Sequence, residues 1–144
     1  MKWLLSALIF YATLAPAQAL PRVMSLNLCA DAYLMHFAAK TQVVALTPQS
    51  RDASLSAMAE TAQSYPISDG QIESIAALTP DLVIVSSYSD PLRNRLIEKL
   101  GIPLLVQNAA NGFGAARAEM LSLGDAIGLS LIHISEPTRT RGNL

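Results

Sequence analysis

Residues 70–88 read GQIESIAALTPDLVIVSSY, and this stretch decides the architecture that the sequence predicts. A short amphipathic helix stops before Pro80, and a wholly apolar strand at residues 82–85 follows at once. A strand that is apolar on both sides belongs inside a parallel sheet covered by helices. Ser86 and Tyr88 then fall at the carboxyl end of that strand, where open α/β sheets bind their ligands.

The surrounding sequence alternates strand patterns with helix patterns. Strands alternating with helices favour a mostly parallel sheet with helices on both faces, so we predict an α/β fold. The expected strands are residues 22–26, 43–46, 82–85 and 103–106, with an extended piece at 64–67, and the expected helices are residues 28–39, 54–62, 71–78, 91–100 and 116–127.

Two of these helices have marked starts. Asn27 can cap the first, and Asp90 can cap the fourth with Pro91 as its first residue; Gly101 then suits a left-handed terminator. The spacing of apolar residues predicts which face of each helix is buried. These predicted faces are Leu28, Ala32, Met35 and Ala39 in the first helix, and Leu92, Leu96, Ile97 and Leu100 in the fourth.

The amino-terminal end matches a cleavable secretory signal peptide, residues 1–19. Lys2 precedes a short apolar run, and Ala17-Gln18-Ala19 fits the small-x-small cleavage pattern. The run is shorter than the roughly 20 apolar residues that a membrane-spanning helix needs. We therefore expect an exported protein.

The carboxyl-terminal end, residues 129–144, reads LSLIHISEPTRTRGNL. Its first part, residues 129–139, resembles the conceptual translation of a sequencing-library adapter. The alternative is a natural strand, because Ile132 and Ile134 favour strands. We predict a non-native tail that makes no packing contacts, which leaves residues 20–128 as the folded lobe.

The composition allows one modest domain and disfavours several classes of protein. The chain has 144 residues, 51% of them hydrophobic, so it can bury a core. Its formal net charge of −1 does not favour nucleic-acid binding, which usually needs a basic patch. Cys29 is the single cysteine, so no internal disulfide can form.

No enzyme signature is present in the sequence. Residues 111–114 lack the glycine spacing of a dinucleotide-binding loop, and Ser86-Ser87 lacks the flanking glycines of a nucleophile elbow. We expect Cys29 to be a small buried residue and His36 to be a partly buried helix residue without a second metal ligand. We therefore predict no enzyme activity, no cofactor and no resident metal.

Polar residues gather where each predicted strand ends. In a parallel sheet these loops share one edge, so they form a single polar face with an aromatic element in Tyr88 and a cation for an anionic ligand in Arg51. Loops are polar in any case, which is the plainer reading of the same pattern. The residues that we predict to contact a ligand are Asn27, Leu28, Ser50, Arg51, Ser86 and Tyr88.

Four motifs together resemble the periplasmic substrate-binding proteins of iron–siderophore and vitamin B12 ABC importers. They are RVMSLN at residues 22–27, VVALT at 43–47, IESIAALTPDLVI at 72–84 and LGIPL at 100–104. The third is the most specific of the four. The resemblance covers nearly all of residues 22–128.

The resemblance implies two Rossmann-like lobes joined by one long, rigid helix, with the ligand held in the cleft between the lobes and little hinge motion. The ligand would be an iron–siderophore, haem or a corrinoid such as cobalamin, captured in the periplasm. A surface glutamate on each lobe would dock on arginines of the ABC permease in the inner membrane. Glu73 matches the glutamate of the first lobe. In the first turn of a helix its carboxylate also interacts favourably with the helix dipole.

The chain departs from this pattern because the linking helix and the second lobe are missing from its sequence. We therefore expect an amino-terminal lobe with half of the cleft, which by itself has weak binding and little or no transport function. Two alternatives remain open: an exported enzyme built on a flavodoxin-like α/β domain, and an exported interaction domain without a small ligand.

Overall fold

The structure is a computed structural model that describes residues 19–129. The predicted tail beyond Leu129, and the predicted signal peptide up to residue 18, lie outside the described residues. In chain order the elements are β1 (Val23–Ser25), α1 (Leu28–Phe37), the 3-10 helix η1 (Lys40–Gln42), β2 (Val43–Ala45), the 3-10 helix η2 (Pro48–Arg51), α2 (Ala59–Ala62), α3 (Ile72–Leu78), β3 (Leu82–Ser86), α4 (Pro91–Lys99), β4 (Leu104–Gln107) and α5 (Phe113–Ala126).

The four strands form one parallel sheet in the order β2-β1-β3-β4, which confirms the predicted α/β fold. Val23 of β1 pairs with Val43 on one side and Leu82 on the other, and Val83 pairs with Leu104 at the edge. A further parallel bridge joins Leu46 to Ile67, in the predicted extended piece.

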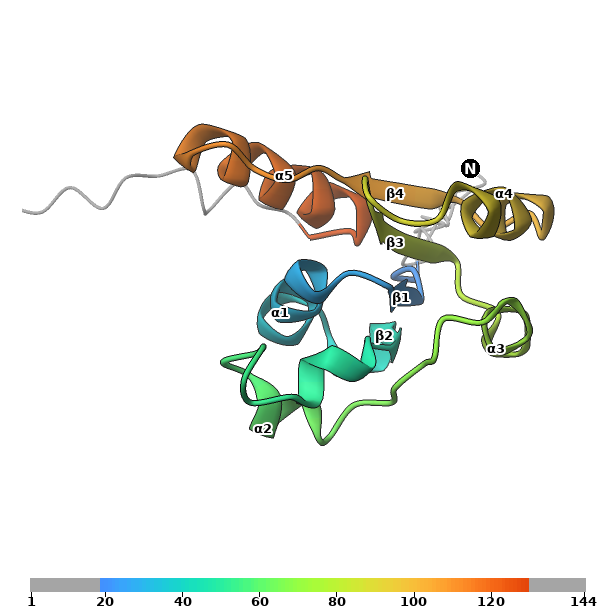
Figure 1. The fold of residues 1–144 in the computed structure, drawn as a ribbon, viewed down its shortest axis with the longest axis horizontal. Helices are drawn as coiled ribbons and strands as arrows, with labels where there is room; N and C mark the ends of the chain where they lie inside the picture. Colours follow the sequence, from blue (N-terminus) through green and yellow to red (C-terminus); the bar gives the residue numbers. More distant parts are fainter. Residues whose placement is uncertain (1–18, 130–144) are drawn as a thin grey trace, which may run out of the picture.

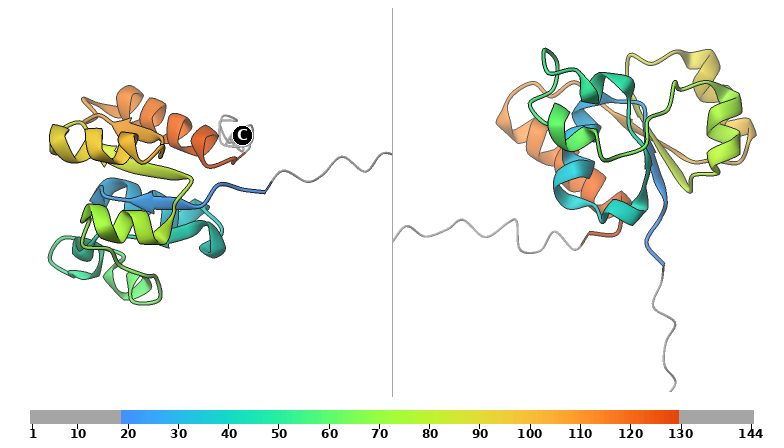
Figure 2. Two further views of the ribbon diagram at one scale, coloured as in Figure 1. Left: turned by 90° about the vertical axis from the view of Figure 1, so that its right-hand side faces the viewer. Right: turned by 90° about the horizontal axis from the view of Figure 1, so that it is seen from below.

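Helices cover both faces of the sheet (Figures 1 and 2). Helices α1 and α5 pack on one face, where Leu34 and Leu123 join a cluster with Val23 of β1. Helices α3 and α4 pack on the other face, where Ile75 and Ile97 join a second cluster. The central strands are therefore shielded from water on both sides, as their apolar sequence requires.

The two predicted helix caps and the Gly101 terminator are confirmed, whereas the first helix ends earlier than predicted, at Phe37, and the last begins earlier, at Phe113. The side chain of Asn27 accepts the Cys29 N–H at 2.9 Å, and that of Asp90 accepts the Leu92 N–H at 2.9 Å. Both side chains satisfy donors that have no partner inside the helix. Gly101, with φ of 78°, follows the end of α4 in the left-handed region.

The predicted buried face of α1 is only partly right, since Met35 is buried as expected. Ala32 and Ala39 are exposed, and Ala39 lies beyond the end of the helix. Nearly every residue of this helix is apolar, so the period alone does not choose a face. The residues buried beside Met35 are Ala30, Asp31 and Leu34, which were not predicted.

The predicted buried stripe of α4 is likewise only partly right. Ile97 is fully buried, but Leu92, Leu96 and Leu100 are 64%, 37% and 46% exposed. Helix α4 covers the outer part of the sheet, next to the edge strand β4, and Leu92 and Leu96 line an open hollow between α4 and α3.

Helix α2 is shorter than expected. Of the predicted residues 54–62, only Ala59–Ala62 are helical, and the 3-10 helix η2 at Pro48–Arg51 precedes them. Ser54 instead bonds the Asp52 carboxylate through its N–H and its hydroxyl, which holds the preceding residues in a turn.

Leu129 departs from the prediction that the tail makes no packing contacts. Its N–H donates to the Gly124 carbonyl at 2.9 Å. The N–H of Gly128, whose φ is 76°, donates to the Asp125 carbonyl at 3.1 Å. These two bonds form a Schellman motif, which ends α5. The Leu129 side chain packs against the cluster that contains Leu123. The packed structure thus reaches Leu129, and the nature of residues 130–144 stays a prediction.

Leu129→Ser is expected to lower the free energy of unfolding by about 1–2 kcal/mol, because it removes a partly buried leucine from the core. Leu55→Ser is the matched control, since Leu55 is 57% exposed, and should change that free energy by less than about 0.5 kcal/mol. Urea denaturation of both variants measures the difference. Equal midpoints would show that the packing of Leu129 contributes nothing.

Candidate ligand-binding site

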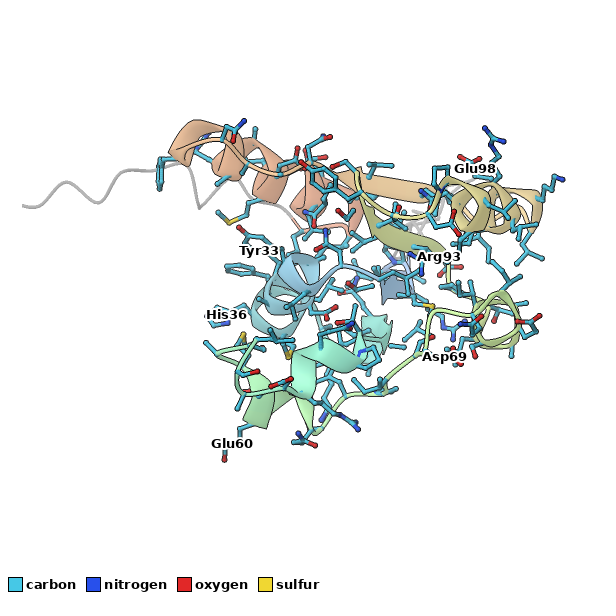
Figure 3. All side chains as sticks on the ribbon, viewed as in Figure 1. Tyr33, His36, Glu60, Asp69, Arg93 and Glu98 are labelled. Carbon is cyan, nitrogen blue, oxygen red and sulfur yellow. The ribbon has the colours of Figure 1, made fainter. Side chains whose placement is uncertain are left out.

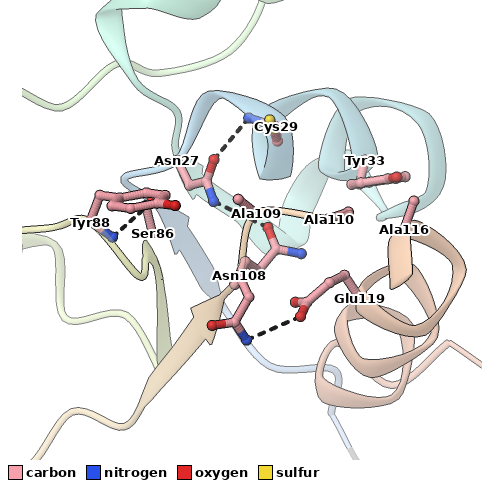
Figure 4. Close-up of a pocket in the computed structure, with 11 residues that line it drawn as sticks. Asn27, Cys29, Tyr33, Ser86, Tyr88, Asn108, Ala109, Ala110, Ala116 and Glu119 are labelled. Carbon is pink, nitrogen blue, oxygen red and sulfur yellow. Dashed lines mark hydrogen bonds between the residues drawn. The ribbon is translucent and has the colours of Figure 1, made fainter. Parts of the chain in front are cut away.

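A hollow of about 360 Å³ lies at the carboxyl ends of the strands (Figure 4). Strands β1, β3 and β4 each lead into it, and α1 and α5 contribute side walls. The strand order reverses between β1 and β3, because β2 lies on one side of β1 while β3 and β4 lie on the other, and open α/β sheets bind ligands at such a switch point. The lining residues are Asn27, Cys29, Tyr33, Ser86, Tyr88, Gln107, Asn108, Ala109, Ala110, Ala116 and Glu119.

The turn after β3 presents Tyr88 to solvent at the mouth of the hollow. The Tyr88 N–H donates to Ser86 Oγ at 3.2 Å, and the Ser89 N–H donates to the Ser86 carbonyl at 2.9 Å. These bonds fix the turn while the Tyr88 side chain stays free, so that Tyr88 is 83% exposed. Tyr33 stands on the opposite side of the drawn residues in Figure 4, so aromatic rings flank the hollow.

Three carboxamide side chains line the floor between the rings. Asn27 Nδ2 donates to Gln107 Oε1 at 3.4 Å, and Asn108 Nδ2 donates to Glu119 Oε1 at 3.1 Å. Gln107 is 5% exposed, and its backbone carbonyl accepts the Ser87 N–H at 2.9 Å, which ties the end of β4 to the end of β3. The amides are therefore held by their neighbours before any ligand arrives.

The hollow is without a cation in its wall. None of its lining residues is arginine, lysine or histidine, and Glu119 is the one lining residue with a carboxylate. The rest of the lining is amide, hydroxyl, aromatic, methyl and thiol. Such a wall suits an uncharged or cationic ligand surface better than an anionic one.

The structure brings three of the six predicted ligand residues together, and it separates the others. Asn27, Ser86 and Tyr88 all line the hollow. Leu28 is partly buried in the first turn of α1 and is not part of the lining. Whether the first three contact a ligand stays a prediction.

Ser50 and Arg51 have structural contacts in place of the predicted access to a ligand. Ser50 is fully buried, and its hydroxyl donates to the Thr47 carbonyl at 2.7 Å. The Arg51 guanidinium donates to the carbonyls of Ala62 and Tyr65, at 3.3 and 2.6 Å. Arg51 thus neutralises the carboxyl end of α2, and its cation is held at that helix end.

Several lining residues were missed or misread from the sequence. Cys29 is exposed in the wall, where a buried residue was expected, and His36 is exposed away from it. Tyr33 and Glu119 come from helices whose orientation the sequence does not fix. Gln107 and Asn108 belong to the polar residues expected at the strand ends, because both follow the fourth predicted strand, but they were not among the six predicted ligand residues.

Asp31 is a buried carboxyl beneath this edge of the sheet. It is 0% exposed, and its Oδ2 accepts the N–H and the hydroxyl of Thr47, while Oδ1 has no partner among the described residues. Burial raises the pKa of Asp31 to about 6, and the hydroxyls of Ser25 and Thr47 only partly offset that effect. Asp31 joins α1 to the loop after β2, which fixes the helix face that the sequence misplaced.

Glu73 is exposed in the first turn of α3, as a docking residue must be. A second hollow of about 270 Å³ lies between the first turns of α3 and α4, with Arg93 and Leu96 in its lining and Glu73 outside it. Figure 3 shows Asp69 and Arg93 in this region, and His36 and Glu60 on other parts of the surface. The docking role of Glu73 stays a prediction.

Two searches of the described residues gave negative results. None of the helices within residues 19–129 has the length and hydropathy that crossing a membrane requires. The same residues contain no cluster of three or more histidine, cysteine, aspartate or glutamate side chains arranged to hold a metal ion.

Comparison with solved structures gives the fold a precedent. No family model matches the chain, and no curated protein matches it. A periplasmic haem-binding protein from Pseudomonas aeruginosa aligns with 77% of this chain and 39% of its own, at 18% identity and a TM-score of 0.63. The periplasmic haem-binding protein BhuT, solved with two haems, aligns with 74% of this chain and 41% of its own, at 17% identity and a TM-score of 0.56.

The sequence identities and the aligned lengths limit what can be concluded from this likeness. At 17% and 18% identity the likeness establishes a shared fold, and it does not establish a shared ligand. The chain spans about two-fifths of the length of each of these proteins, 39% and 41%.

Asp31→Asn is expected to remove a pH dependence of stability. The unfolded carboxyl has a pKa of 3.8 and the folded one about 6, so the folded chain holds this proton more tightly. The stability that Asp31 contributes is complete below the unfolded pKa and is lost as the pH rises through the folded pKa. The wild-type free energy of unfolding should therefore fall relative to the variant between about pH 4 and pH 6, by up to about 3 kcal/mol.

Urea denaturation at several pH values measures this difference. Asp52→Asn is the control: the Ser54 hydroxyl lowers the pKa of the exposed Asp52, so its contribution is lost only at lower pH. A wild-type minus Asp31→Asn difference that stays constant across the window would contradict the account of Asp31.

Proposed function

We propose that the chain is the amino-terminal ligand-binding lobe of a periplasmic solute-binding protein that delivers haem, another iron chelate or a corrinoid to an ABC importer. The observation that carries the proposal is the hollow at the carboxyl edge of a sheet whose fold matches periplasmic haem-binding proteins. Its open side and flanking tyrosines suit one face of a large, flat molecule.

The proposal includes a second lobe that closes over this hollow. A typical pocket encloses most of the surface of its ligand, and the described residues contact only one side of such a molecule. The alignment with about two-fifths of each solved protein, 39% and 41%, supports this arrangement. We propose that residues 1–19 direct export to the periplasm. We also propose that the tail, which was predicted to begin at residue 129, is not native sequence beyond Leu129.

Visible absorption titration with gallium protoporphyrin, dicyanocobinamide and a ferric siderophore tests the binding function. We expect saturable, weak binding of at least one of them without chemical change, and about tenfold weaker binding in Tyr88→Ala, because an aromatic contact is lost. Leu55→Ala, at an exposed site outside the hollow, should bind like the wild type.

The other outcomes separate the alternatives. Conversion of a ligand into a product would favour the flavodoxin-like enzyme. Absence of binding to every ligand would favour an interaction domain.

Glu73→Ala in the intact protein tests the docking role. Loss of an exposed carboxylate that meets arginines of the permease should reduce permease-dependent uptake several-fold and leave ligand affinity unchanged. Glu60→Ala removes an exposed carboxylate from α2 and should leave uptake unchanged. If Glu73→Ala instead weakens ligand binding, the residue belongs to the ligand site.

A further inference from the structure

Resting on that proposed function, we infer that the ligand presents neutral carboxamide groups, and no carboxylates, to this lobe. Between haem and a corrinoid, this favours the corrinoid, whose macrocycle is fringed with carboxamides. Haem carries propionate carboxylates at its edge. The inference rests on the donors and acceptors of the hollow, the positions of the basic side chains and the placement of Glu119.

The floor of the hollow offers both halves of an amide–amide hydrogen bond. Gln107 Nε2 donates no hydrogen bond among the described residues, and Asn108 Oδ1 accepts none. A ligand carboxamide has one acceptor oxygen and an NH₂ donor, so it can satisfy both kinds of group. A carboxylate only accepts, and it would leave Asn108 Oδ1 without a donor.

None of the basic side chains of the described residues lines the hollow. The Arg22 guanidinium donates to the carbonyls that end α3, and that of Arg51 to the carbonyls that end α2. Lys40 Nζ stands 5.3 Å from the ring centroid of Tyr65, and Arg93 lines the hollow between α3 and α4. The remaining ones are exposed and outside the lining: His36, Arg95, Lys99 and Arg117.

Glu119 makes the preference for a neutral ligand surface stronger. Its Oε1 accepts the Asn108 amide at 3.1 Å, so the carboxylate is held in the wall. A ligand carboxylate beside it would meet a like charge and would lose water without gaining a counter-ion. A carboxamide in the same place can donate to Glu119 instead.

A pair of matched ligands tests the inference directly. Dicyanocobinamide carries side-chain amides, and dicyanocobyrinic acid is the same macrocycle with carboxylates in their place. Gallium protoporphyrin is a diamagnetic stand-in for haem. Titration of the ¹⁵N-labelled chain reports on the hollow through the side-chain NH₂ signals of Asn27, Gln107 and Asn108, even for weak binding.

We expect dicyanocobinamide to shift these signals and to bind at least tenfold more tightly than the other two ligands. In Glu119→Gln the ratio of the dissociation constants of the two corrin ligands should fall several-fold, because the like charge is removed while a hydrogen-bond acceptor remains. Glu98→Gln removes an exposed carboxylate on α4, outside the hollow, and should leave this ratio of dissociation constants unchanged.

Two further outcomes overturn the inference in distinguishable ways. Equal or tighter binding of dicyanocobyrinic acid or gallium protoporphyrin at these signals would overturn the carboxamide preference and leave the proposed function standing. If neither these three ligands nor a gallium-loaded siderophore shifts the three NH₂ signals at millimolar concentration, the hollow is not a ligand site, and the proposed function falls together with the inference.

Discussion

The parallel pairing of β1 with β3 is the contact on which the rest of the structure depends. Val23, Met24 and Ser25 pair with Leu82, Val83 and Ile84, and five of these six residues are fully buried. Strands without a polar side must be covered on both faces, which requires the two helical layers. Because the strands are parallel, their carboxyl ends lie together, and Asn27 and Ser86 reach the same hollow.

Much of the architecture could be predicted from the sequence because the signals were local. The apolar strand at 82–85, the cap at Asn27 and the Asp90-Pro91 start each depend on a few neighbouring residues, and the structure contains all three. The failures came where distant parts of the chain decide the outcome. The orientation of α1 depends on Asp31 bonding Thr47, sixteen residues away.

The candidate site was only partly predictable for the same reason. Position after a strand placed Asn27, Ser86 and Tyr88 correctly at the hollow. The same reasoning selected Arg51, whose partners are carbonyls contributed eleven and fourteen residues later. The exposure of the apolar residues of α4 could not be predicted from the sequence either, because the sequence does not say which elements cover a helix. Exposed apolar groups of this kind often mark contact surfaces.

The central claim is that ligand binds at the carboxyl edge between β1, β3 and β4. Hydrogen–deuterium exchange of the chain with and without saturating dicyanocobinamide tests it most directly. The account predicts slower exchange in the backbone of residues 27–33, 86–89 and 107–119, with α2 and α3 unchanged. Protection confined to α3 and α4, or no protection anywhere, would contradict it.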